Sequence, residues 1–88
     1  MPPPLRLIWS DAAQDDLYLL RAGLADDCER AKRIGRIILD AADCVADYPE
    51  RGTVGTAPGT RELPLPGLPW RLVYRQDYRG VVILRLLA

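Results

Sequence analysis

The sequence contains no histidine and no phenylalanine, and its 88 residues include only two cysteines and one methionine. The absence of histidine excludes Ser-His and Cys-His nucleophilic catalysis, and it removes both the commonest general base at neutral pH and the usual zinc ligand. The glycine-containing stretch 52–59 also lacks the phosphate-binding fingerprint and its lysine. We therefore expect no metal and no cofactor, and we favour a binding protein over an enzyme.

The two cysteines, Cys28 and Cys44, lie sixteen residues apart within one expected helix. A helix of that length would separate them by about 24 Å along its axis, which is beyond the reach of a disulfide. We expect two free thiols, with Cys44 buried in the core and Cys28 exposed near the start of the helix.

The chain has no apolar run that approaches the length needed to span a bilayer. Its first residues, Met1–Arg6, lack the apolar stretch of a signal peptide, and their prolines predict a short extended tail. We expect a cytoplasmic protein without membrane contact, folded as one domain over residues 1–88 with a single modest core.

Lysine is nearly absent, since Lys32 is the only one, and the net charge is zero. The charge is unevenly spread: residues 1–50 carry six basic and ten acidic side chains, whereas residues 51–88 carry six arginines but only Glu62 and Asp77 as acids. The second half therefore favours docking to an acidic partner. The whole molecule is not the strongly basic protein expected of a dedicated nucleic-acid binder.

The first quarter of the chain predicts a strand followed by a helix. Leu5–Trp9 alternates in the manner of a short strand. Ser10 is a suitable N-cap for an amphipathic helix that runs from Asp11 to about Leu24 or Ala25.

A second, longer helix follows after a short break. Asp26 with Glu29 three residues later resembles a capping box at its start, and Pro49 ends it after Tyr48. Gly35 either lets the two helices of this antiparallel hairpin approach closely or is simply a tolerated cost of about 1 kcal/mol relative to alanine.

The second half predicts strands. Pro49–Gly59 has the composition of a loop, and Thr60–Leu65 is an edge strand because of its prolines. Trp70–Gln76 and Val81–Leu87 form a hairpin joined by Asp77–Gly80. The order is β-α-α-β-β-β, an α+β fold in which an antiparallel sheet carries the helical hairpin on one face.

The last strand is too apolar to fix which of its sides faces the helices. One alternative places Val82, Leu84 and Leu86 against the helices and Val81, Ile83, Arg85 and Leu87 outward, and the other alternative is the reverse. Either arrangement leaves one sheet face too apolar for a monomer, so we expect a partner chain.

An ordered set of short motifs resembles the RelE/ParE toxin superfamily, and the ParE side in particular. The likeness runs from about Leu5 to Leu87, and its motifs are Trp9-Ser10, Asp11–Ala13, Asp16-Leu17, Asp47–Glu50, Gly59–Leu63, Trp70–Arg75 and Val82–Leu87. The resemblance implies a type II toxin-antitoxin system, in which an antitoxin wraps and inactivates a small toxin. It also implies a hetero-oligomer. We expect this complex to contact DNA only through the antitoxin, because the charge of the chain itself does not supply DNA binding.

The resemblance implies two alternative targets. ParE-like toxins poison DNA gyrase by binding, whereas RelE-like toxins cleave messenger RNA in the ribosome, and fold alone does not decide between them. Cleavage requires cations and proton carriers at the scissile phosphate, for which the candidates are Arg61, Arg71, Tyr74 and Arg85. Because the chain has no histidine and no net positive charge, we favour gyrase inhibition. An inactive scaffold for antitoxin-complex assembly is a third alternative.

Exposed apolar and aromatic character suggests where an antitoxin would bind. The residues that we expect to contact it are Leu17, Tyr18, Leu20, Leu24, Ile37, Tyr48, Trp70 and Tyr78.

Overall fold

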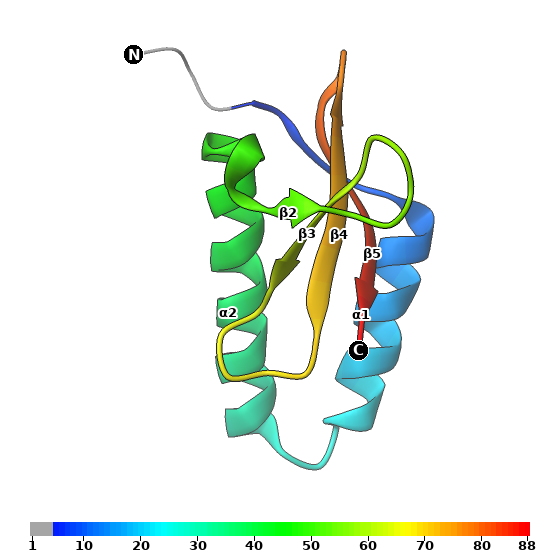
Figure 1. The fold of residues 1–88 in the computed structure, drawn as a ribbon. Helices are drawn as coiled ribbons and strands as arrows, with labels where there is room; N and C mark the ends of the chain where they lie inside the picture. Colours follow the sequence, from blue (N-terminus) through cyan, green and yellow to red (C-terminus); the bar gives the residue numbers. More distant parts are fainter. Residues whose placement is uncertain (1–4) are drawn as a thin grey trace.

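The computed structural model describes residues 5–88, so the expected extended tail at the proline-rich start lies outside the described residues. Figure 1 shows two helices beside a twisted sheet, with the connection between the helices at one end of the molecule and the turn between the last two strands at the other. In chain order the elements are β1 (Leu7–Trp9), α1 (Asp11–Gly23), α2 (Cys28–Asp47), the short 3-10 helix η1 (Pro49–Arg51), β2 (Thr53–Val54), β3 (Arg61–Pro64), β4 (Arg71–Asp77) and β5 (Gly80–Leu87).

The five strands form one mixed sheet in the order β1-β5-β4-β3-β2. β1 runs parallel to β5, with Leu7 opposite Val81 and Trp9 opposite Ile83, and every other neighbouring pair is antiparallel. The α+β class is confirmed, but the predicted all-antiparallel sheet is wrong at β1. The alternation of apolar residues predicts a strand and says nothing of its neighbour, and the helices provide the long crossover that a parallel pair needs.

The segment predicted as loop, Pro49–Gly59, contains η1 and the two-residue strand β2. In β2, Thr53 pairs with Glu62 and Val54 pairs with Arg61 of β3. The predicted order therefore lacks one strand. Two residues are too few to show an alternating pattern, so this strand depends on the edge that β3 offers.

Both helices begin at a side-chain cap. The Ser10 hydroxyl accepts a hydrogen bond from the Ala13 backbone N–H at 3.1 Å, which confirms the predicted start of α1. The cap of α2 is Asp27, whose carboxylate accepts from the Arg30 N–H at 3.0 Å. The predicted capping box between Asp26 and Glu29 is thus wrong by one residue, because either of two adjacent aspartates can supply the oxygen.

The two helices do not approach each other closely at Gly35. A Cβ atom added there would meet nothing within 4 Å. The expectation of a tight helix pair is therefore wrong. The space between the helices is a groove, described below, that is open to solvent.

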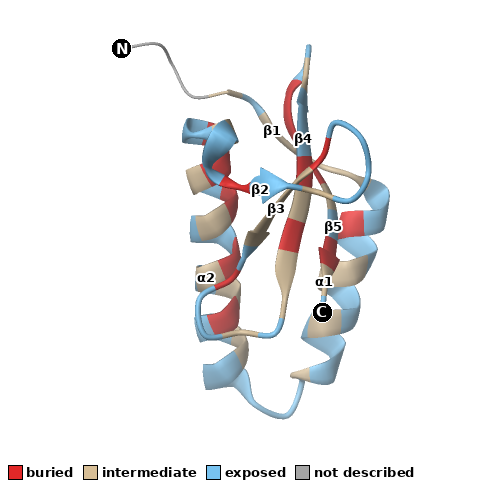
Figure 2. Ribbon diagram, in the orientation of Figure 1, coloured by how far each residue is buried: buried red, intermediate tan, exposed pale blue. Residues whose placement is uncertain are grey.

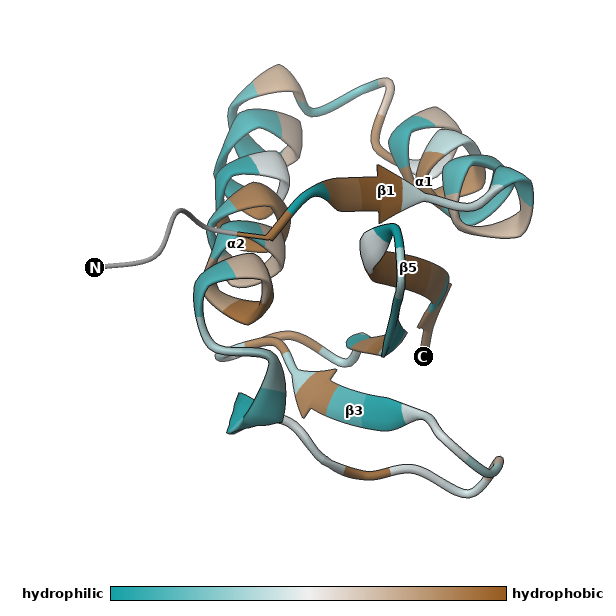
Figure 3. Cartoon of the chain, turned by 90° about the horizontal axis from the view of Figure 1, so that it is seen from above, coloured by the Kyte–Doolittle hydropathy of each residue, from teal (hydrophilic) through white to brown (hydrophobic). Residues whose placement is uncertain are grey.

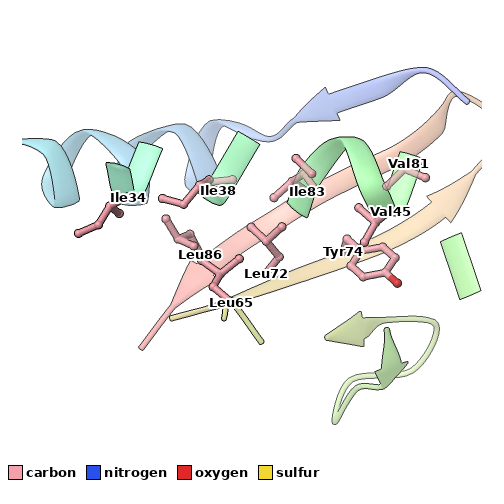
Figure 4. Packing of buried hydrophobic residues seen from close by; sticks show 11 residues of the cluster. Ile34, Ile38, Val45, Leu65, Leu72, Tyr74, Val81, Ile83 and Leu86 are labelled. Carbon is pink, nitrogen blue, oxygen red and sulfur yellow. The ribbon is translucent and has the colours of Figure 1, made fainter. Parts of the chain in front are cut away.

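A bulge in β5 decides which of its side chains enter the core. Val73 of β4 pairs with Arg85 and Tyr74 pairs with Ile83, so Leu84 has no partner on β4. The extra residue shifts the alternation, and the side chains that reach the core are Val81, Ile83 and Leu86 (Figure 4). Neither predicted alternative is right, because an all-apolar strand gives no sign of where a bulge lies.

One hydrophobic core joins the two helices to one sheet face. Its members come from α1, α2, the β3–β4 connection, β4 and β5, and they are Ala13, Ile34, Ile38, Ala42, Val45, Leu65, Leu72, Tyr74, Val81, Ile83 and Leu86. Figure 2 shows the buried positions gathered on the inner sides of the helices and strands. Cys44 is half-buried rather than buried, and Cys28 is exposed as expected.

The exposed apolar side chains are not on the outer sheet face, where the sequence led us to expect them. Val82 there is 3% exposed. The large apolar residues that solvent reaches lie on the helices, on β2 and on the β4–β5 turn, and they are Tyr18, Leu19, Leu39, Tyr48, Val54 and Tyr78. In Figure 3 the apolar strand β1 lies between α1 and α2, next to the apolar strand β5.

Two glycines provide a test of this backbone. Gly80 has φ +133°, and a Cβ there would collide with the backbone of Arg6. We expect Gly80→Ala to lower the free energy of unfolding by about 1–3 kcal/mol. Gly35→Ala should raise it by about 0.5–1 kcal/mol, because the helical backbone suits alanine and the site is open. Urea unfolding of both variants measures this, and equal effects at the two sites would contradict the described strand contact.

Candidate functional site

Side chains of α1 bond the edge of β5 beyond the point where β1 ends. The Ser10 hydroxyl donates to the Leu84 carbonyl at 2.9 Å, and one Asp16 carboxylate oxygen accepts from the Leu86 N–H at 2.9 Å. Arg85, a candidate catalytic residue, donates to both Asp16 oxygens, at 2.7 and 2.9 Å. These bonds, led by that from Arg85, hold the pKa of Asp16 below its ordinary value. Arg85 is therefore tied to α1.

Arg71, the second candidate, lies on the outer sheet face. Its Nε donates to Glu62 of the neighbouring strand at 2.8 Å, and its Nη1 donates to the carbonyl of Ala88 at 2.8 Å. This side chain joins β3 to the end of β5. It is 38% exposed, so one edge of the guanidinium still faces solvent.

Arg61 and Tyr74 form a third contact, on the helix side of the sheet, where they are paired across β3 and β4. The Tyr74 hydroxyl donates to the Pro49 carbonyl at 2.7 Å and accepts from the Gly52 N–H at 2.8 Å. Arg61 donates to the Gly52 carbonyl at 2.8 Å. Burial raises the pKa of the Tyr74 phenol, so the hydroxyl keeps its proton at neutral pH.

The four candidates for RNA cleavage therefore do not converge on one point. Arg61 and Tyr74 contact η1 and Gly52. Arg71 contacts Glu62, and Arg85 contacts Asp16. Within residues 5–88, moreover, no cluster of three or more His, Cys, Asp or Glu side chains could hold a metal ion. No helix in that part of the chain is long and apolar enough to cross a membrane.

A groove with a volume of about 560 Å³ lies between α1 and α2. It lies toward the connection between the helices, and we call it the interhelical groove. Its lining residues are Leu17, Leu20, Arg21, Leu24, Ala25, Cys28, Ala31, Lys32, Ile34, Gly35, Ile38 and Leu39. Most of this surface is apolar, and it is continuous with the core through Ile34 and Ile38.

The charged side chains that line the interhelical groove have one sign. Arg21 belongs to α1 and Lys32 to α2, and the lining includes no carboxylate. This is notable because residues 1–50 carry more acidic than basic side chains. A ligand that fits the groove would be apolar along its centre and acidic where it passes these two residues.

The structure distributes the eight predicted antitoxin contacts over several surfaces. Leu17, Leu20 and Leu24 line the interhelical groove. Trp70 lines a second hollow of about 380 Å³ beside the C-terminal part of β5. Ile37 packs against the core, whereas Tyr18, Tyr48 and Tyr78 are exposed elsewhere.

Sequence reasoning missed the part of the groove that α2 contributes. Leu39 is 54% exposed, and Lys32 and Gly35 lie on the same wall. The sequence did contain one indication of this wall. Leu39 directly follows the core residue Ile38 and widens the apolar stripe of the helix beyond what the sheet covers.

Comparisons with known proteins found a matching family, a relative in sequence and a solved structure with the same fold. A family model described as ParE toxin of type II toxin-antitoxin system, parDE, matches residues 7–88. The chain is 39% identical over 62 residues to a protein of Sinorhizobium fredii named "Putative toxin Y4kP"; the match spans 70% of this chain and 64% of that protein's length. In a solved structure of the chromosomal ParDE toxin-antitoxin system of P. aeruginosa, one chain has the same fold, with a TM-score of 0.81, 22% identity and 94% coverage of both chains.

The contact between Asp16 and β5 predicts a specific pH dependence. Because its pKa is lowered in the folded chain from 3.8, Asp16 stabilises the fold fully above about pH 4, and this contribution is lost as the pH falls through the lower folded value. Asp16→Asn should cost about 1–3 kcal/mol at pH 7. Its difference from the unmodified chain should shrink in acid.

The exposed neighbour Asp15 is the matched control, and Asp15→Asn should change stability by less than about 0.5 kcal/mol. Urea unfolding at pH 7 and at pH 3 measures both variants. A constant difference between Asp16→Asn and the unmodified chain across this range would contradict the assigned contact.

Proposed function

Because the chain belongs to the ParE toxin family of type II toxin-antitoxin systems, we propose that it arrests growth by binding DNA gyrase in the cytoplasm. Family membership implies an antitoxin partner. In this proposal the antitoxin neutralises the toxin by occupying its surface, and the toxin acts by binding and makes or breaks no covalent bond. Any contact with DNA is made by the antitoxin, since the toxin has no net positive charge.

The observation that supports binding over RNA cleavage is that each candidate catalytic group is already engaged within the chain. Arg71 is paired with Glu62 and Arg85 with Asp16. The Tyr74 hydroxyl makes one donated and one accepted hydrogen bond. A ribonuclease lowers its barrier with groups that already point at the scissile phosphate. Here these groups would first have to leave their partners.

The interhelical groove is the surface that we assign to the antitoxin. A groove between two helices with an apolar floor suits an amphipathic helix, whose apolar residues recur every three or four positions. Leu17, Leu20 and Leu24 would meet that apolar stripe. Arg21 and Lys32 on opposite walls would pair with carboxylates on its flanks, so the proposed ligand is an acidic, amphipathic antitoxin segment.

The remaining predicted contacts fit an antitoxin that continues past the groove. The folded chain is 40 Å long. About a dozen extended residues reach that far, so an antitoxin anchored in the groove could also cover Trp70 and Tyr78. Neutralisation in this proposal is steric, because the antitoxin covers surface that the target would otherwise meet.

We expect the purified chain to inhibit DNA supercoiling by purified gyrase in proportion to its concentration. Its expression without antitoxin should block replication and induce a DNA-damage response. Arg71→Ala should keep this activity within about twofold, because the residue makes a partly exposed ion pair that contributes little energy.

The alternatives give different results in the same experiments. Arrest of translation with cleaved messages, lost in Arg71→Ala, would replace gyrase inhibition by ribosome-dependent RNA cleavage. The absence of any growth effect under strong expression would favour the third alternative, an inactive scaffold for antitoxin-complex assembly.

Two charge reversals on α2 test the antitoxin surface. Lys32→Glu places a negative charge in the groove wall, and we expect it to weaken antitoxin binding about tenfold or more. Arg36→Glu makes the same change at an exposed position outside the groove lining, and it should leave the dissociation constant within about twofold. Titration calorimetry with the cognate antitoxin measures both.

Cys28 gives a second readout, because its exposed thiol lies in the groove wall. In a Cys44→Ser background, bound antitoxin should slow alkylation of Cys28. Unchanged alkylation at saturating antitoxin, or equal effects of the two charge reversals, would contradict the assignment of the groove.

A further inference from the structure

The turn between β4 and β5 presents an aromatic ring and a guanidinium at the end of the molecule farthest from the connection between the helices (Figure 1). Tyr78 is 96% exposed, the highest value among the large apolar residues with substantial exposure. The Arg79 guanidinium lies over its ring, 5.9 Å from the ring centre. In Figure 2 this end of the sheet is coloured as exposed. We call residues 75–80 the hairpin tip.

The hairpin tip is held in one conformation by Asp77. One carboxylate oxygen accepts from the Arg79 backbone N–H at 2.8 Å, and the other accepts from the Arg79 side chain at 2.8 Å. These bonds lower the pKa of Asp77, with the Arg79 side chain as the largest cause, so the carboxylate stays charged at neutral pH. Tyr78 and Arg79 are thereby positioned before any partner arrives, which reduces the entropy cost of binding.

The base of the hairpin tip is also fixed. Gly80 follows the turn with φ +133°, and the next residue, Val81, donates its N–H to the Arg6 carbonyl of the segment leading into β1 at 2.8 Å. Directly below the turn the two strands are paired without interruption from Asp77–Gly80 to Tyr74–Ile83. The tip is thus an extension of the sheet, braced by β1, and not a loose loop.

The charge of the tip is positive although the chain as a whole is neutral. Asp77 is shared by Arg75, at 3.9 Å, and Arg79, at 2.8 Å. The backbone of Arg6, an exposed residue, lies beside Gly80 at the base of the tip. One carboxylate against two partly exposed guanidinium groups leaves N–H donors without a partner in the tip, and such donors suit carboxylates or phosphates.

A protein surface suits this arrangement better than a nucleic acid does. Tyr and Arg are among the residues that carry most of the binding energy of protein interfaces. Nucleic-acid binding draws its affinity from many phosphates, commonly about six to ten. The tip offers two cations, Arg75 and Arg79, on a chain whose net charge is zero.

We infer that the hairpin tip is the element with which this toxin contacts its target, through an acidic protein patch with a recess that receives the Tyr78 ring. This inference rests on the proposed function, because it names the toxin surface that the target meets. The interhelical groove lies toward the opposite end, so a target could engage the tip while the groove is empty. An antitoxin that extends over the tip would block this contact.

Two single substitutions test the inference in the full chain. We expect Tyr78→Ala and Arg79→Glu each to raise the concentration that half-inhibits purified gyrase by about tenfold or more, and to relieve growth arrest in cells. Both should keep their thermal midpoint close to that of the unmodified chain. The Tyr78 side chain is almost wholly exposed, and the Arg79–Asp77 ion pair is partly exposed and contributes little to stability, while the bond from the Arg79 backbone N–H to Asp77 does not need the side chain.

The matched controls are Val54→Ala, at an apolar residue that is 80% exposed on β2, and Arg33→Glu, a charge reversal at an exposed position of α2. Both should inhibit like the unmodified chain.

Each remaining outcome has a distinct meaning. If the unmodified chain inhibits gyrase and arrests growth while the folded tip variants do so equally well, the inference about the tip is overturned and the proposed function stands. If the unmodified chain neither inhibits gyrase nor arrests growth, both the inference about the tip and the proposed function are overturned.

Fluorescence anisotropy with labelled single-stranded and duplex DNA provides a separate test of DNA binding. DNA binding by the unmodified chain that Tyr78→Ala and Arg79→Glu both abolish would overturn the assignment to an acidic protein surface.

Discussion

The fold depends on how the edge of β5 is satisfied once β1 has ended. β1 is three residues long, so beyond Ile83 the edge of β5 that faces away from β4 has no strand beside it. An unpaired backbone group costs free energy comparable to a lost hydrogen bond when it is buried. Ser10 and Asp16 of α1 supply the missing partners at Leu84 and Leu86. This contact fixes α1 along β5 and stabilises the bulge that directs Leu86 into the core.

The position of α1 has consequences for the rest of the surface. Because α1 is tied to the edge of β5 and α2 packs over the sheet, the helices stay apart where they extend past the core, and the interhelical groove remains. At the other end of the sheet, β1 braces the β4–β5 turn, which projects from the fold. The strand β5 therefore positions both an apolar groove and a cationic aromatic tip, which lie at opposite ends of the folded molecule. It also explains why Arg85, on the same strand, serves as an ion-pair partner of α1.

Much of this architecture could be predicted from local patterns. Ser10 before an apolar stripe predicts the start of α1, and two branched or alternating runs around Asp77–Gly80 predict the hairpin. What could not be predicted depends on contacts between distant segments. Three such features are the parallel neighbour of β1, the two-residue β2 and the bulge at Leu84. None of them produces a recognisable pattern in an apolar or glycine-rich stretch of sequence. The same distinction applies to the site, since Leu17, Leu20 and Leu24 follow from a helical stripe. Lys32 and Leu39 join them only because the helices do not pack closely together.

The central claim is that the chain is a rigid binding body whose target contact lies at the hairpin tip, away from the interhelical groove. Backbone amide hydrogen exchange of the chain, alone and bound to purified gyrase, tests it most directly. The account predicts that bound gyrase slows exchange across residues 75–81 and leaves the amides around residues 20–35 unchanged. Protection confined to the groove, with free exchange at the tip, would contradict it.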